Sequence, residues 1–269
     1  MSLELRDRDL GQLLATILET ATSQFGRLLL FQLPGVVPLI LLQLAFDPAG
    51  ALDGLKLDAP PEQLFPVLAR FYGALLVLAV GTVLVLPIKL AAAALLVEQL
   101  VDGRPPDAWA CLGGALRLWP RTLLLVVTWN VAATIGIFAC VLPGLAIYAL
   151  FLASPAVVVL ERQLPWMAAF QRSRELARGR LLENFVVYLA TVYAPALVAA
   201  PFLIAASLLP GTAATIVTHL LTLGVETLML VSYPIVYFHL RTVNEALDVE
   251  RLTALVDAIG AREAARAAP

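Results

Sequence analysis

TLLLVVTWNVAATIGIFACVLPGLAIYALFLASPAVVVL, residues 122–160, decides the fold, because it contains no Asp, Glu, Lys or Arg. As one helix this stretch would be about 58 Å long, roughly twice the thickness of the hydrocarbon core of a bilayer. The chain must therefore turn back within it. Leu142-Pro143-Gly144 lies near the middle, and proline ends a helical hydrogen-bond ladder whereas glycine takes turn conformations. The stretch predicts two membrane-spanning helices joined by a tight turn at residues 142–144.

The chain as a whole is apolar. Of its 269 residues, 61% are hydrophobic and 14% are charged, against about 25% charged in soluble domains. Three more charge-free runs, 28–46, 71–88 and 184–225, could each cross a bilayer. Leu209-Pro210-Gly211 predicts a second tight turn, whereas Leu33-Pro34-Gly35, early in the first run, predicts a kink. We expect an all-α integral membrane protein, one domain over residues 1–269, with six transmembrane helices at 28–46, 66–98, 120–142, 144–161, 183–209 and 212–241.

The positive charges fall almost entirely on one side of these spans. Every arginine except Arg70 lies on that side, and the opposite side receives Lys56, Arg70 and the acidic loop 47–62. Lysine and arginine accumulate in cytoplasmic loops. We therefore expect both termini in the cytoplasm and the turns at 142–144 and 209–211 outside.

Amphipathic segments precede the first, third and fifth spans. Within residues 1–26, apolar side chains from Leu10 to Phe25 form one helical stripe, and Asp9 is positioned to cap the helix. Similar segments begin near Pro106 and Pro165 and end with arginine. We interpret all three as interfacial elbow helices, so that the chain forms three units of an elbow and a hairpin. The alternative for residues 1–26 is a helix folded against the cytoplasmic ends of the spans.

Residues that follow the first predicted turn form a recognisable pattern: Pro155, Leu160-Glu161, Ala168, Arg172-Ser173, Leu176 and Gly179-Arg180. This pattern resembles the membrane domain of bacterial glycerophosphoryl diester phosphodiesterases and the stand-alone six-span proteins related to it. The resemblance implies a multi-pass bacterial inner-membrane protein of unassigned role and supplies no catalytic residue in this domain. Since only residues 242–269 follow the sixth span, we expect no phosphodiesterase domain in this chain.

Catalytic motifs are absent from the sequence. It contains no H-E-x-x-H, G-x-S-x-G, P-loop or G-x-G-x-x-G pattern. His219 and His239, the only histidines, would lie about 30 Å apart on one helix and could not share a metal. The net charge of -2 offers no basic surface for nucleic acid. We therefore expect a protein that is not an enzyme and that has no metal, cofactor or nucleic-acid partner.

Lys89 and Glu226 are the most deeply placed charges. Measured from the predicted outer ends of their helices, they lie at similar depth, within reach of one lysine side chain. We predict that they form an intramembrane ion pair. The pair could fix helix packing or belong to a proton or ion path, and alternatively Lys89 could extend alone to the cytoplasmic face.

The third elbow carries a cluster of basic residues next to Trp166, Met167 and Phe170. A basic amphipathic helix of this kind suits anionic lipid headgroups. Positive charge there could equally serve as an ordinary topology signal. The predicted lipid-headgroup residues are Arg172, Arg174, Arg178 and Arg180.

Two classes of function remain open from the sequence. The first is a membrane protein that organises lipids, anionic phospholipids in particular, or partner membrane proteins. Residues 242–269 form an amphipathic cytoplasmic tail that could dock on the elbows or on such a partner. The second is a small transporter or channel, for which the chain offers these polar residues within its spans: Arg70, Lys89, Asn130, His219 and Glu226.

Overall fold

The computed structural model describes residues 9–46, 61–209 and 211–267, which form helices and short connections with no strand among them. The all-α prediction is confirmed. The elements are α1 (Leu10–Ser23), α2 (Phe25–Phe46), α3 (Pro61–Val101), α4 (Ala108–Ala139), α5 (Val141–Leu150), α6 (Ser154–Leu160), α7 (Ala168–Leu176), α8 (Leu181–Tyr188), the π-helical turn η2 (Leu189–Tyr193), α9 (Ala194–Ser207) and α10 (Gly211–Ala267).

Six segments of the described chain are long and apolar enough to cross a membrane, as predicted. The fourth consists of α5 and α6, and the fifth combines α8, η2 and α9. The sixth belongs to α10, which continues without a break into the predicted tail. The segments are Phe25–Ala45, Leu64–Val101, Ala108–Ala139, Val141–Leu160, Leu181–Ser207 and Thr212–Glu245.

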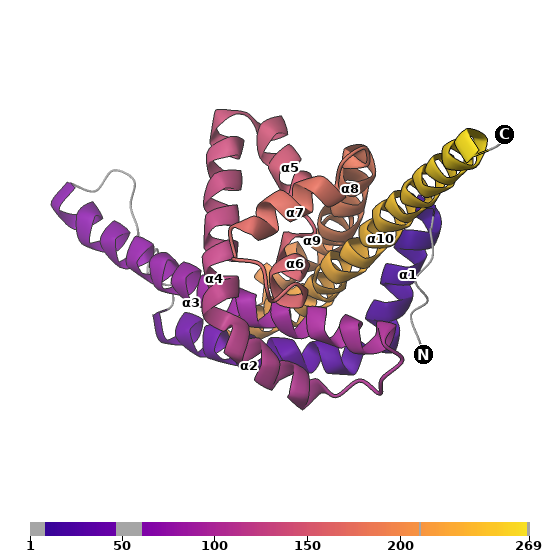
Figure 1. The fold of residues 1–269 in the computed structure, drawn as a ribbon. Coiled ribbons are helices and arrows are strands. Elements are labelled where there is room, and N and C mark those ends of the chain that lie inside the picture. The colour runs from indigo at the N-terminus through magenta and orange to yellow at the C-terminus, as the bar shows by residue number, and fades with distance from the viewer. Residues whose placement is uncertain (1–8, 47–60, 210, 268–269) are drawn as a thin grey trace.

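The segments form hairpins that share a core at one end. Figure 1 shows the α4–α5 hairpin pointing upward while α2 and α3 extend to the left. Three buried stretches dominate the core, residues 90–97 of α3, 154–159 of α6 and 230–240 of α10, and side chains of α1, α2, α4, α7 and α8 pack around them. Alanines 91–94 let the helices approach closely. At the hairpin tips, Phe138 and Leu208 are 87% and 83% exposed and would contact lipid.

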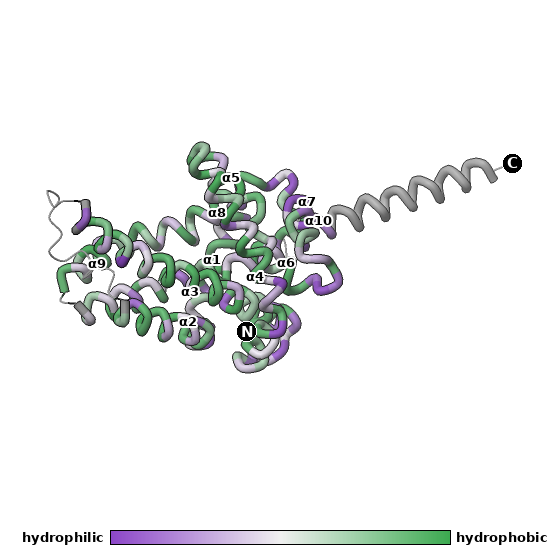
Figure 2. Tube along the Cα trace, turned by 90° about the vertical axis from the view of Figure 1, so that its left-hand side faces the viewer, coloured by the Kyte–Doolittle hydropathy of each residue, from purple (hydrophilic) through white to green (hydrophobic). Residues whose placement is uncertain are grey.

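Hydrophilic residues gather at one end of the molecule, around α7 and the adjoining part of α10 (Figure 2). We call this the elbow end. There Arg162 of the α6–α7 loop lies 3.9 Å from Glu98 of α3, and α7 packs on both α6 and α10. Loops that the sequence assigns to one side of the membrane therefore lie together.

The predicted turn at residues 142–144 is wrong by a few residues. The chain turns at Cys140, whose backbone is extended, and Pro143 and Gly144 lie in the first turn of α5. Proline is tolerated there because that position needs no intrahelical N–H donor. Gly144 instead allows α5 to approach α4, since a Cβ at this position would lie 2.6 Å from the backbone nitrogen of Ile137. Leu33-Pro34-Gly35 lies inside the uninterrupted helix α2, so it forms no turn, as expected.

The elbows differ from one another. The first and third are separate helices, α1 and α7. The second is not, because residues 108–139 form one helix through Pro120, and Gly114 and Trp119 keep its first part packed on α3. Leu13 and Ile17 of α1 are 1% exposed and this helix packs on α10, which supports the alternative of a helix folded against the ends of the spans.

Replacement of Gly144 by alanine tests the close contact of α4 with α5. The added Cβ would overlap backbone atoms of Ile137, so we expect Gly144→Ala to lower the free energy of unfolding by about 1–3 kcal/mol. Gly224→Ala is the matched control, because a Cβ there meets nothing within 4 Å and alanine favours a helix. Thermal unfolding in detergent measures both. Equal stability of the two variants would contradict this role of Gly144.

Candidate functional site

A polar cavity of about 190 Å³ lies inside the membrane-spanning part, between α2, α3 and α10. Its apolar wall is formed mainly by valine and leucine side chains. Its polar lining consists of Gln43, Thr82, Lys89, Thr218, His219, Thr222 and Glu226. Such groups are expensive in lipid and mark functional sites more often than other positions in a span.

Lys89 and Glu226 come together at this cavity. Lys89 Nζ donates to Glu226 Oε2 at 2.7 Å, which joins α3 to α10 as the sequence predicts. The two side chains are 6% and 29% exposed, so the ammonium group is enclosed by protein while the carboxylate has an open side. Gly35 lets α2 pack closely on α3 beside the pair, because a Cβ there would overlap Val85 Cγ1 and lie 3.1 Å from Lys89 Cε.

Two glutamines of α2 extend the polar contacts, and sequence analysis missed both. His219 Nε2 lies 2.9 Å from Gln43 Oε1, and Gln32 Nε2 donates to Thr227 Oγ1 at 2.9 Å. Gln32 is fully buried, and its Oε1 has no partner among the described residues. The spacing of the two glutamines could have predicted this. Gln32 and Gln43 are eleven residues apart and therefore share one face of α2.

The other polar residues of the spans lie elsewhere. Asn130 donates to Val126 O within α4 and accepts from the Tyr148 hydroxyl of α5 at 3.3 Å. This is the cross-helix contact expected of an amide in a span. Arg70 is exposed and does not line the cavity. The described residues contain no group of three or more His, Cys, Asp or Glu that could hold a metal ion.

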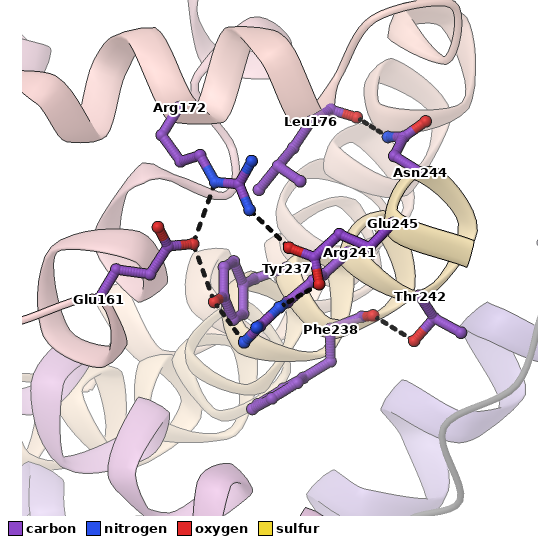
Figure 3. A network of polar contacts seen from close by, with 9 residues as sticks. All are labelled: Glu161, Arg172, Leu176, Tyr237, Phe238, Arg241, Thr242, Asn244 and Glu245. Atoms are coloured by element: carbon purple, nitrogen blue, oxygen red, sulfur yellow. Dashed lines mark hydrogen bonds and ion pairs between the residues drawn. The ribbon is translucent and has the colours of Figure 1, made fainter. Parts of the chain in front are cut away.

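The structure separates the four arginines of the third elbow into two kinds. Arg172 joins α7 to α6 and α10, because its Nε donates to Glu161 at 3.1 Å and its Nη2 to Glu245 at 2.6 Å (Figure 3). Burial lowers the pKa of Arg172, but the hydrogen bonds and charges of Glu161 and Glu245 outweigh that effect and raise it. Arg180 pairs with Glu183 at 2.8 Å.

Figure 3 shows that the Arg172 contacts belong to a larger network. Tyr237 donates its hydroxyl to Glu161 at 3.0 Å, and Arg241 donates to Glu245 at 2.7 Å. Asn244 donates to the carbonyl of Leu176, the last residue of α7, at 2.6 Å. Arg172 is therefore a structural residue that fixes α7 against α10. Lipid-headgroup binding by the four arginines stays a prediction, and two of them, Arg172 and Arg180, have carboxylate partners within the protein.

Arg174 and Arg178 are exposed and line an open groove of about 980 Å³ beside α7. We call it the α7 groove. Its apolar wall includes Phe151, Phe170 and Leu181, and Glu175 and Gln171 form its remaining polar lining, with Gln171 donating to Glu175 at 3.1 Å.

Arg121 is a structural residue that sequence analysis did not identify. Its guanidinium donates to the backbone carbonyls of Glu161, Arg162 and Leu164, which follow the end of α6. These carbonyls lie in the loop after α6, and an arginine can bind several at once because it carries five donors in a fixed geometry. The contact attaches α4 to the α6–α7 loop at the elbow end.

Comparison of the chain with known protein families, with curated proteins and with solved structures found no match.

Breaking the Lys89–Glu226 pair should destabilise the protein. Removal of one partner leaves the other charge inside the membrane. We therefore expect Lys89→Met or Glu226→Gln to lower the free energy of unfolding by about 3 kcal/mol. This is the lower end of the range for buried pairs, because Glu226 is partly exposed. The double variant should be less destabilised than the sum of the two. A double-mutant cycle by detergent unfolding measures the coupling, and strictly additive effects would show that the pair contributes nothing.

Proposed function

We propose that this multi-pass membrane protein is not an enzyme and that it organises membrane lipid by binding anionic phospholipid in the α7 groove. The observation that carries the proposal is the groove itself, where Arg174 and Arg178 lie beside an apolar wall. Neither arginine forms an ion pair within the described part of the chain. Their charges are thus available to a ligand.

The lining of the groove matches the two ends of a phospholipid. The arginines suit a phosphate, to which guanidinium groups bind in a bidentate manner. Phe151, Phe170 and Leu181 offer an apolar surface to an acyl chain. Glu175 carries the opposite charge and supplies an acceptor for a headgroup hydroxyl, which favours a glycerol headgroup over a bare phosphate.

The proposed location follows from the same residues. The arginine excess of the elbow end supports a cytoplasmic position for this end and for both termini, in a bacterial inner membrane. The cytoplasmic leaflet attracts basic side chains with about 1 kcal/mol each when it contains anionic lipid. Binding of a partner membrane protein through residues 242–269, and the resemblance to the phosphodiesterase membrane domains, stay predictions.

Neutralising the two groove arginines tests the proposal. At about 1 kcal/mol for each arginine, Arg174→Gln with Arg178→Gln should weaken binding of phosphatidylglycerol by about 30-fold. Mass spectrometry of lipid retained by the detergent-purified protein measures the change. The fold should be unaffected, because Arg172 and its carboxylate partners are unchanged.

The matched control is Arg104→Gln with Arg162→Gln, which removes equal charge from arginines that pair with Asp102 and Glu98 instead of lining the groove. This control should retain its phosphatidylglycerol. Unchanged lipid in the groove variant, or equal loss in both double variants, would refute the α7 groove as a lipid site.

A further inference from the structure

The polar cavity is closed toward the elbow end and extends from the ion pair toward the hairpin tips. On the elbow side of the pair, Phe31, Gln32, Leu90 and Leu230 are at most 2% exposed. On the other side, Gln43 lies within one helical turn of the end of α2, and Thr218 lies about two turns from the start of α10. The cavity is therefore a pocket with an inner end at Lys89 and Glu226.

One face of α10 supplies polar side chains along this pocket. His219, Thr222 and Glu226 follow one another at intervals of three and four residues and so lie on the same side of the helix. The volume of about 190 Å³ holds roughly six water molecules at about 30 Å³ each. It is too small for a lipid headgroup with its chains and large enough for a solute of a few heavy atoms.

Charge balance restricts what can bind. Among the described residues, the titratable groups that face the cavity are Lys89 from α3 and His219 and Glu226 from α10, and α2 contributes only uncharged side chains. With the pair intact, Lys89 and Glu226 neutralise each other. An uncompensated charge in this low-dielectric environment costs several kcal/mol. Any ligand that breaks the pair must therefore restore neutrality.

We infer that this cavity is a binding site for one small monocarboxylate together with one proton. The proton adds to Glu226 Oε2 and forms a neutral carboxyl group, which breaks the contact with Lys89 Nζ. The carboxylate of the ligand then takes over the position of the Glu226 carboxylate against Lys89. Anion and proton enter together from solution, so the net charge of the site does not change.

The remaining lining fits this ligand. The hydroxyl group of Thr218 can donate to the second carboxylate oxygen, whereas those of Thr82 and Thr222 donate to the carbonyls of Leu78 and Thr218 in their own helices. His219 lies about two turns from Glu226 toward the tips, so an entering proton meets it first. The inference is independent of lipid binding in the α7 groove, because the two sites share no residue.

Acetate binding with proton counting tests the inference on the wild-type protein. We expect calorimetric titrations in two buffers of different ionisation enthalpy to show uptake of about one proton for each acetate bound. By linkage, the affinity should fall about tenfold for each unit of pH increase wherever binding takes up one proton. Acetamide, the neutral analogue of the same shape, should not bind. Absence of acetate binding, or binding without proton uptake, would overturn the inference.

Two variants separate the roles of the pair. Glu226→Gln imitates the protonated carboxyl group, so it should bind acetate without proton uptake and without the pH dependence. Lys89→Gln should lose at least tenfold in acetate affinity. Arg174→Gln with Arg178→Gln is the control and should bind acetate as the wild type does. A folded Glu226→Gln protein whose acetate affinity keeps the wild-type pH dependence would exclude Glu226 as the proton acceptor.

Discussion

A lysine inside a membrane span needs a partner, and much of the arrangement of α2, α3 and α10 follows from this constraint. The ammonium group of Lys89 is enclosed by protein and meets the Glu226 carboxylate at 2.7 Å, so α3 and α10 are held at a fixed depth relative to each other. Gly35 lets α2 pack against Val85 and the lysine stem of α3, and Gln32 attaches α2 to α10 through Thr227. Three helices from two hairpins are thereby fixed around one charge pair.

The two ends of the bundle are held by different forces. At the elbow end, Arg172 and Arg121 attach α7 and the α6–α7 loop to α10 and α4 through charged and carbonyl groups. Toward the tips, large apolar side chains such as Phe138 are exposed, and surrounding lipid would have to cover them. Because the hairpins pack tightly at the elbow end and face lipid at their tips, room remains between them for a cavity. This cavity is lined by the charged groups that cannot face lipid.

The sequence predicted the features that depend on the membrane as a solvent. Charge-free runs such as residues 122–160 predicted the spans, because lipid offers no partner to a charge or to an open backbone. The Lys89–Glu226 pair followed from depth alone. Features that depend on contacts between helices could not be predicted from the distribution of charge along the chain. The turn lies at Cys140 because Gly144 is used to approach Ile137, and the second elbow merges with its span because α3 supports it. Whether an arginine of the third elbow is paired or exposed depended on which carboxylates the fold brings next to it, as Glu245 is brought to Arg172.

Lys56 and Lys89 are the only lysines of the chain, which makes the central ion pair directly measurable. In a Lys56→Arg background, Lys89 gives the single lysine ¹⁵Nζ resonance in solid-state NMR spectra of the protein in bilayers. The account predicts strong dipolar dephasing of this resonance by the ¹³Cδ of a glutamate, and loss of that dephasing in Glu226→Gln. A Lys89 resonance without dephasing, or with dephasing that survives Glu226→Gln, would contradict the pair on which this account of the structure depends.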